Sequence, residues 1–580
     1  MNQLTEIFLK QKKLLSLVVL AIIGLAIYAN SFNNQLFWDD DDVITNNYYI
    51  KNVEYWPKFF SESLIAGAGQ VSNYWRPLLL VSFSLDYQVW GLTPFGYHLT
   101  NTILHILAAW LVFLFLFKIS RAYSLSFIVS LLFLIQPLNT EAVTYAAGRA
   151  DPLSTVLVML ALIFYWDARQ EQTEVKKPRL KFIFSLIFFL AGLLVKEQVV
   201  MLPALVLLVE YVLIDWNKNF WQKLLPALPY VFLAAAYLAM RLLFLNFNDL
   251  LGGMAYDSSL YNSSLYVRLL TFTKVMVDYI GLLFAPLGLH MAREVAPVTS
   301  FFSRPVIIFL LALALAVLIA VKTWRTNKLI AFGLAWYAIW LLLRANVLQI
   351  NRPMYEHWLY LPMVGFWLAM LGLIVLIWEK YGKLKILKQA GLTVLLVYVL
   401  IFSWLTIKRN QDWRDPITFY EKNLRYTPSS FIQHNNLGMA YAAAGRNDQA
   451  IAEYLKAIAI KDVYAQVHHN LANVLAATGR LDGAVEEYKK AMSLSPAFQL
   501  PYQNLLSIYL NNKNKAGAEA VLLEMKKNLG ENIYFKYAGL AAYFSGDYSS
   551  AIKFWRLWLT LEPDSLEARG LISEALNRTQ

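Results

Sequence analysis

Four consecutive aspartates, Asp39 to Asp42, lie shortly after the first apolar segment of the chain. Carboxylates this close repel one another, so such a run persists where it is solvated, where it holds a metal, or where a carboxylate does chemistry. In the last case Trp38 could shield Asp39 from water and hold it in a proton-accepting state. The plainer alternative is a solvated acidic turn that helps to fix the membrane topology.

Four cations that could hold a phosphate occur in later segments between apolar runs. Arg76 lies between Tyr74 and Pro77, where its guanidinium could anchor lipid phosphate or clamp a phosphorylated donor. Lys196 interrupts an apolar stretch beside Glu197, and these two charges could simply neutralise each other. The other two cations are Arg149 and Arg352.

Polar groups also enter one of the apolar segments. His98, Asn101 and His105 are spaced i, i+3 and i+7, so they form one stripe of a helix. Polar groups at membrane depth are costly and usually face a functional site inside the helix bundle. Two further carboxylates, Glu141 and Glu356, and the neighbouring His357 lie in the segments 136–151 and 351–362.

The composition identifies the class of protein that contains these clusters. Of 580 residues, 58% are hydrophobic and 16% charged, which is typical of an integral membrane protein that carries a soluble portion. The net charge of +12 comes largely from Lys and Arg in short loops, so it follows the positive-inside rule and does not indicate a nucleic-acid partner. The absence of cysteine excludes disulfides, thiolate nucleophiles and Cys-ligated metals.

A membrane span needs roughly 20 predominantly apolar residues, and by this measure the chain has eleven predicted crossings. They are Leu14–Phe32, His98–Phe117, Tyr123–Pro137, Pro152–Asp167, Phe182–Val195, Val199–Ile214, Leu224–Leu245, Pro305–Val321, Leu329–Leu343, Leu361–Trp378 and Ala390–Ile407. The stretch Val267–Phe284 contains Lys274 and Asp278, so it is either a twelfth span or an interfacial helix. The first crossing is followed by polar Asn30 and Asn33 without a small-residue cleavage site, which predicts a retained span.

The distribution of basic residues predicts which side each loop occupies. Lys and Arg are concentrated in the short loops that lie on the same side of the membrane as the N-terminus, such as 118–121, 169–181 and 380–388. These loops are therefore expected inside, which places the long loop 33–97 with the acidic run outside. Eleven crossings then place everything after Ile407 outside as well.

A repeat of 34 residues begins after the last crossing. Leu437, Gly438, Tyr441 and Gly445 recur as Leu471, Ala472, Leu475 and Gly479, and two less regular units follow. Small residues where helices meet and glycine at the turn are typical of the tetratricopeptide repeat, whose arrays hold a peptide or a partner protein. We therefore predict an all-α protein with two parts: a bundle of transmembrane helices over 1–407, and a solenoid of a half repeat plus about four repeats over 408–580.

The order of short motifs along the chain resembles the TMTC-type membrane proteins and their bacterial relatives, which belong to the GT-C glycosyltransferases. The motifs are Trp38–Asp40, Tyr74–Leu78, Gly96–Asn101, Pro137–Glu141, Gly148–Asp151, Lys196–Gln198 and Leu359–Pro362, followed by the repeats. This resemblance covers nearly the whole chain. It implies a GT-C-like fold and an inverting transfer of a sugar from a polyprenyl-phosphate donor to an acceptor hydroxyl.

The resemblance also implies roles for the candidate residues. Asp39 or Asp40 would be the general base that takes the acceptor proton. If the loop is extended, adjacent residues point to opposite sides and only one of the two can face the reacting centre, and we favour Asp39.

The other implied roles concern charge and support. The donor phosphate would be held by Arg76, Arg149, Lys196 and Arg352, and the supporting residues would be His98, Asn101, His105, Glu141, Glu356 and His357. A divalent metal, Mg or Mn, could bind Asp39 and Asp40.

The chain departs from the pattern of its relatives at several positions. Gln136 and Asn139 stand where relatives commonly have His, and His357 stands where they commonly have Arg. These changes leave the carboxylate chemistry intact and bear on the donor sugar and the phosphate contacts.

Three functions remain open from the sequence. The first is glycosylation of Ser or Thr in proteins presented by the repeats, and the second is transfer to lipid A or a glycan. The third is a non-catalytic scaffold whose repeats gather partners for envelope assembly or secretion. The predicted location is a bacterial inner membrane with the repeats in the periplasm, the alternative being the endoplasmic reticulum with the repeats in its lumen.

Overall fold

The computed structural model of the chain describes residues 3–171, 178–214, 219–243, 261, 264–291, 293–347, 352–381 and 385–579. Over these residues the regular secondary structure is helical, which confirms the predicted all-α class. Contacts divide the chain into a membrane unit, Met1–Phe419, and a repeat unit, Tyr420–Gln580. The two are described separately.

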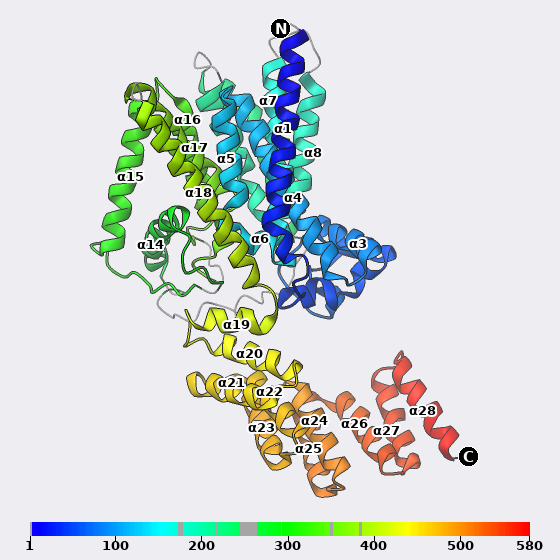
Figure 1. The fold of residues 1–580 in the computed structure, drawn as a ribbon. Helices are drawn as coiled ribbons and strands as arrows, with labels where there is room; N and C mark the ends of the chain where they lie inside the picture. Colours follow the sequence, from blue (N-terminus) through cyan, green and yellow to red (C-terminus); the bar gives the residue numbers. More distant parts are fainter. Residues whose placement is uncertain are drawn as a thin grey trace. The chain divides into compact units, whose positions relative to one another are not determined.

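Long apolar runs form the helices of the membrane unit (Figure 1). The helices are α1 (Gln3–Tyr28), α2 (Trp56–Ser61), α3 (Pro77–Trp90), α4 (Pro94–Ser120), α5 (Tyr123–Ile135), α6 (Thr140–Val143), α7 (Ala150–Glu171), α8 (Pro178–Leu193), α9 (Leu202–Leu208), α10 (Phe220–Leu224), α11 (Leu228–Leu243), α14 (Leu265–Phe284), α15 (Arg304–Thr323), α16 (Lys328–Leu342), α17 (Pro362–Tyr381) and α18 (Lys385–Gln411). Glycine lets α16 and α17 approach closely: a Cβ added at Gly333 or Gly365 would lie 2.4 Å from the carbonyl oxygen of the other. Small residues at helix crossings are a usual device of membrane bundles.

Seven of the described helices are long and apolar enough to cross a membrane, or up to eight if the bent pair Tyr123–Ile135 and Pro137–Val143 is one span. The integral membrane class is therefore confirmed. The crossings predicted at Phe182–Val195, Val199–Ile214 and Leu329–Leu343 coincide with the shorter helices α8, α9 and α16. The number of eleven crossings stays a prediction.

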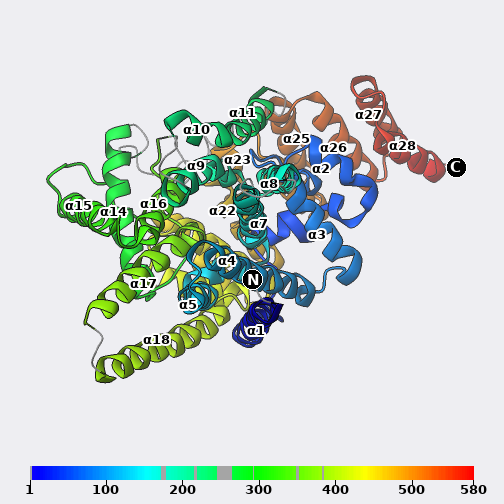
Figure 2. The same ribbon diagram turned by 90° about the horizontal axis from the view of Figure 1, so that it is seen from above.

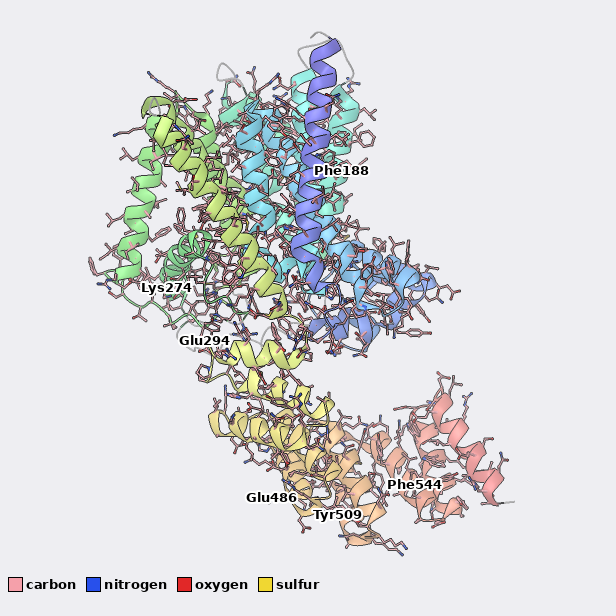
Figure 3. All side chains as sticks on the ribbon, viewed as in Figure 1. Phe188, Lys274, Glu294, Glu486, Tyr509 and Phe544 are labelled. Atoms are coloured by element: carbon pink, nitrogen blue, oxygen red, sulfur yellow. The ribbon has the colours of Figure 1, made fainter. Side chains whose placement is uncertain are left out.

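Helix α14 runs in a different direction from its neighbours. It is seen nearly end-on in Figure 1 and along its length in Figure 2, so it lies across α15. Lys274, labelled in Figure 3, pairs with Asp278 one turn later at 2.6 Å, and both side chains are about one third exposed. Of the two alternatives for this stretch, an interfacial helix fits this direction better than a twelfth span.

The candidate residues lie mainly in short turns at the end of the bundle marked by α3 and α6, opposite the N-terminal end of α1 (Figure 1). The turns of the membrane unit are η1 (Ala29–Ser31), η2 (Asp41–Thr45), η3 (Tyr48–Lys51), η4 (Val53–Tyr55), η5 (Ala66–Ala68), η6 (Pro137–Asn139), η7 (Ala146–Arg149), η8 (Glu197–Met201), η9 (Val209–Leu213), η10 (Leu225–Ala227) and η11 (Glu356–Leu359). Ile44, Phe59, Leu79 and Phe83 are fully or almost fully buried and give the first long loop a core of its own. This core fixes the loop that carries the acidic run.

The chain then forms pairs of helices, which confirms the predicted solenoid. They are α19 (Pro416–Leu424), α20 (Phe431–Ala443), α21 (Asn447–Ile460), α22 (Ala465–Ala477), α23 (Leu481–Leu494), α24 (Gln499–Asn511), α25 (Lys515–Leu529), α26 (Glu531–Phe544), α27 (Tyr548–Leu561) and α28 (Leu566–Thr579). Gly445, Gly479 and Gly546 occupy the turns inside three pairs with φ of 72°, 77° and 82°, a region that favours glycine. In the third unit Lys513 adopts φ 55° at the same place.

Candidate active site

Aromatic stacking holds the start of the acidic run in place. Trp38 has a left-handed backbone with φ 64°, an uncommon conformation for a bulky residue. Its indole stacks on Tyr145 with ring centroids 5.3 Å apart, and Tyr145 stacks in turn on Trp413 at 5.2 Å. Strained backbone that the surroundings enforce is concentrated at functional sites. Here it turns the chain directly before Asp39.

Asp39 and Asp40 have different surroundings. Asp40 is buried, and its carboxylate accepts hydrogen bonds from the backbone N–H of Ala147 at 2.7 Å and of Phe37 at 3.2 Å. Asp39 is solvent-accessible, and the Tyr145 hydroxyl is close enough to lower the pKa of its carboxyl group. The loop is not extended at this point, because both residues lie in a helical turn, but one side chain is exposed and the other is buried.

The surroundings of Asp39 tune it as a proton acceptor. Its carboxylate reaches solvent from a recess, and the enclosing protein raises the pKa of Asp39 to about 6, with the Tyr145 hydroxyl and Arg76 acting against that rise. Burial also raises the pKa of Asp40, whose two backbone hydrogen bonds oppose the change. A general base is most effective when its pKa lies near the working pH. Asp39 is therefore the carboxylate of the pair that is accessible to solvent and has a pKa suited to a general base.

The remaining two aspartates of the run are partly exposed. Asp42 accepts a hydrogen bond from Gln70 at 2.7 Å, and partial burial raises the pKa of both Asp41 and Asp42. Their partial exposure suits solvated charges.

Arg76 is paired with a carboxylate and still acts on Asp39. Its Nε and Nη2 donate to Glu197 at 3.2 and 2.9 Å, and its guanidinium lies 4.7 Å from the centroid of the Tyr74 ring. Arg241 also reaches Glu197, at 3.3 Å. Burial alone would raise the pKa of Glu197, but Arg76 and Arg241 outweigh it and hold that pKa at about 2. Two arginines thus share one carboxylate.

Lys196 does not neutralise its neighbour Glu197, and that expectation is wrong. Its ammonium donates instead to Asp151 at 2.5 Å, with both side chains buried. Arg344 lies 4.3 Å from the centroid of the Trp358 ring, donates to Gln198 at 3.2 Å, and is close enough to act on the charge of Lys196.

Together, Arg76, Arg241, Lys196 and Arg344 outnumber Glu197 and Asp151, so this part of the site has a positive excess. We call these six residues the cation cluster.

Tyr355 lies within electrostatic range of several of the other candidates. Burial raises the pKa of Tyr355 to about 12, and the charges of Arg352, Glu141 and Asp39 also act on it. Among the described residues Arg352 makes no hydrogen bond or ion pair, so its guanidinium is available. Residues from three separate segments of the chain therefore lie within electrostatic range of Tyr355.

Arg149, predicted as a phosphate ligand, is enclosed by protein. Its side chain has no exposed surface and forms a very short ion pair with Asp86. It also donates to Asn101 Oδ1 at 2.7 Å and to the carbonyl oxygens of Ser82 and Tyr97 at 3.1 and 3.2 Å. With these donors engaged, Arg149 is better placed to position the loops than to bind a ligand.

The polar stripe of α4 fastens the second loop to the bundle. Asn101 donates to the carbonyl oxygens of Val143, Tyr145 and Ala146 at 3.1–3.3 Å. His98 bonds to the Asn34 carbonyl at 3.0 Å. His105 contacts the Tyr360 hydroxyl at 2.5 Å and the Leu134 carbonyl at 3.0 Å. These residues support the site without facing a ligand.

Glu141 and Glu356 each bind a basic partner. Glu141 accepts from the backbone N–H of His357 at 3.1 Å and lies 2.7 Å from its Nδ1. Glu356 accepts from Arg293 at 2.8 Å and from the His290 backbone at 2.8 Å, with Arg409 at 3.6 Å. Glu356 therefore orients arginines, whereas Glu141 orients His357.

The described residues contain no group of three or more His, Cys, Asp and Glu side chains placed to hold a metal ion. Asp40 directs both oxygens at backbone N–H groups, so it does not fit a site in which Asp39 and Asp40 hold one ion together. The involvement of Mg or Mn stays a prediction.

Sequence reasoning missed Arg344, Arg241, Tyr145 and Tyr355. Arg344 directly follows the apolar run of α16, and a cation at the end of a predicted span could have indicated it. Tyr145 and Tyr355 offered no such signal, because aromatic residues are common at membrane surfaces.

Comparison with known proteins matches both parts of the chain. Residues 438–479 match a family model described as "TPR repeat", and residues 465–498 match "Tetratricopeptide repeat". "Protein O-mannosyl-transferase F38B6.6" of Caenorhabditis elegans is 25% identical over 470 residues, covering 78% of this chain and 64% of that protein. "Protein O-mannosyl-transferase Tmtc3" of Drosophila melanogaster is 23% identical and covers 78% and 56%.

A likeness to a solved structure was also found. The crystal structure of ArnT from Cupriavidus metallidurans bound to undecaprenyl phosphate is 13% identical, covers 85% of this chain and 79% of that chain, and has a TM-score of 0.39.

The chain spans less than two thirds of the length of these curated relatives. Within that span the resemblance is confirmed: the chain is similar to TMTC-type protein O-mannosyl-transferases, and its C-terminal part matches tetratricopeptide repeats.

Proposed function

We propose that the protein transfers mannose from a polyprenyl-phosphate donor to a Ser or Thr hydroxyl of a protein acceptor. The observation that carries this proposal is the pairing of one accessible carboxylate, Asp39, whose pKa is about 6, with the nearby cation cluster. The names of the similar proteins, protein O-mannosyl-transferases, support the choice of sugar and acceptor.

The chemical step needs a general base for the acceptor hydroxyl. It needs no general acid, because the phosphate leaves as an anion. Asp39 takes the proton of the acceptor hydroxyl while the acceptor oxygen attacks the anomeric carbon from the side opposite the phosphate. The bond between that carbon and the phosphate oxygen breaks, and the electron pair leaves with the polyprenyl phosphate. The products are an inverted glycoside, protonated Asp39 and a phosphate anion.

The cation cluster suits the charge that develops on the leaving group. A phosphate is already a stable anion, so it needs cations more than a proton donor. Arg76 and Lys196 are held in fixed orientations by Glu197 and Asp151, and fixed donors stabilise charge without having to reorganise. Arg352 and Arg344, neither ion-paired among the described residues, are the cations that a phosphate could engage without displacing a carboxylate.

The test is transfer by the purified full chain in lipid nanodiscs. Polyprenyl-phosphate mannose and a Ser-containing peptide should give a peptide heavier by one hexose in mass spectrometry, and the same peptide with Ala for Ser should not. Asp42→Asn is the matched control, because Asp42 belongs to the same run but is hydrogen-bonded to Gln70 at the surface. A protein that binds partners yet turns over no donor with any peptide, lipid or glycan acceptor would be the scaffold instead.

We further propose that the acidic run and the repeats both face the outer side of the membrane, away from the cytoplasm. Because the chain has no cysteine, single cysteines give labelling without background. A cysteine at the exposed Ser429 should react with an impermeant maleimide on intact cells or vesicles of cell-like orientation. A cysteine at the exposed Arg325 should react only after the membrane is opened. The reverse pattern would refute this orientation.

A further inference from the structure

A row of side-chain amides crosses the repeat unit and takes no part in the chemistry above. Asn436, Asn470 and Asn504 recur at intervals of 34 residues on α20, α22 and α24. Asn470 donates to Asn435 Oδ1 at 3.0 Å, and Asn504 donates to Asn473 Oδ1 at 2.8 Å. Hydrogen bonds thus continue the row from one repeat to the next.

The amides share one face of each helix. Positions i, i+3, i+4 and i+7 of a helix point to the same side. On α22 these are Gln466, His469, Asn470 and Asn473, with Gln466 donating to Asn470 at 3.0 Å. The seven amides that follow this register on the three helices, here called the amide row, are Asn435, Asn436, Gln466, Asn470, Asn473, Gln503 and Asn504.

The helices that carry the row form the inner layer of the solenoid. Besides its own partner, each first helix contacts the first helix of the next repeat, as α20 does α22 and α22 does α24. In a curved array the more closely packed layer lies on the concave side, which is the surface these proteins use for binding.

This layer lacks Lys, Arg, Asp and Glu, and its His468 is already engaged by Glu487 and Asp462. Helices α20, α22 and α24 contain no Asp, Glu, Lys or Arg anywhere in their length, whereas the second helices carry many, such as Glu486 on α23 (Figure 3). A phosphate, a nucleic acid or an acidic peptide would find no cation here. Neutral donors and acceptors instead complement the N–H and C=O groups of a polypeptide main chain.

The row has bonding capacity left. Each amide has two N–H donors and an oxygen with two lone pairs. Among the described residues Asn504 Oδ1 has no hydrogen-bond partner. A hollow of about 490 Å³, lined by Gln466, Tyr464 and Phe498 among others, adjoins the row. His469 packs against Phe498 with ring centroids 5.2 Å apart.

We propose that the amide row binds the main chain of an extended segment of the acceptor polypeptide, with one acceptor side chain in the hollow beside Gln466. The inference rests on the proposed function, because it says how the acceptor of that transfer is held. It implies binding that depends little on acceptor sequence. The row ends before the fourth repeat, where the same register carries Lys536, paired with Glu567, and Tyr537.

Peptide binding by the full chain in nanodiscs, without donor, tests the proposal. The probes are a flexible, uncharged, fluorescent 12-residue peptide, a scrambled version of it, and a version N-methylated at alternate amides. The variant is Asn436→Ala with Asn504→Ala, since both side chains are only half-buried. The control is Asn447→Ala with Gln449→Ala on α21, which removes two amides outside the row.

N-methylation and the row variant should each weaken binding at least about tenfold, because each removes several main-chain hydrogen bonds. Scrambling and the control variant should change it little. Unchanged binding of the N-methylated peptide, loss of binding on scrambling, or no binding of any peptide would overturn the proposal. The N-methylated probe is used with the native protein, so it tests main-chain recognition even if the row variant unfolds.

Because no donor is present, failure of the transfer reaction is distinguishable from failure of this inference. A protein that binds peptide through the row but moves no sugar refutes the proposed transferase and leaves the amide row standing as a peptide site.

Discussion

Asp39→Asn is expected to lower sugar transfer by about 10²–10⁴-fold, the usual effect of removing a general base. Donor binding should change little, because Asp39 is exposed and is not paired with any cation of the cluster. The loss should therefore appear in kcat and not in the KM for donor. Steady-state kinetics with polyprenyl-phosphate mannose in nanodiscs measures both.

The pH dependence distinguishes a base from a structural carboxylate. Because the pKa of Asp39 is about 6, the carboxylate is ionised above that pH and protonated below it. Only the ionised form can accept the acceptor proton, so kcat/KM should fall as the pH drops below about 6 and reach a plateau above it. The residual activity of Asp39→Asn should lack this acidic limb. An unchanged limb in the variant would assign it to another group.

Asp40→Asn provides the comparison at the adjacent position. Asp40 accepts from two backbone N–H groups, and an asparagine offers one oxygen and a second donor in its place. A buried N–H left without an acceptor costs about 1–3 kcal/mol. Asp40→Asn should lower the melting temperature while the folded fraction keeps its acidic limb. If transfer survives Asp39→Asn and the limb disappears in Asp40→Asn, the two roles are exchanged.

The helical architecture could be predicted because its signals are local. Each repeat forms within a few dozen residues, and Gly445 and Gly479 mark equivalent turns that the sequence shows directly. The spans follow from the length of apolar runs in the same way.

The separate roles of the charged residues in the site could not be predicted, because each role depends on partners that are distant in the sequence. Asp40 is set apart from Asp39 by the N–H of Ala147, 107 residues later. Lys196 binds Asp151 and leaves Glu197 to Arg76. A list of charged residues contains no information about which charge will meet which, and that pairing decides which cations remain for a ligand.

Arg149 is the clearest example of a cation whose role depends on its partner. Removing that partner is expected to cause a large loss of stability. The Arg149 guanidinium has no exposed surface and pairs with Asp86, which also accepts a hydrogen bond from Thr100 at 2.9 Å. Asp86→Asn leaves this buried charge without its counterion and should lower the free energy of unfolding by about 3–5 kcal/mol. Unfolding of the purified protein in detergent, followed by thermal or denaturant titration, measures the change.

A second substitution shows whether Arg149 stabilises the fold or binds the donor phosphate. In Asp86→Asn with Arg149→Gln no uncompensated charge remains, so part of the lost stability should return. The control pair is Lys118 and Asp167, 2.7 Å apart and about one quarter exposed, where Asp167→Asn should cost at most about 1 kcal/mol. If instead Arg149→Gln alone leaves stability intact and raises the KM for donor, then Arg149 reaches the phosphate after all, and Asp86 merely holds it ready.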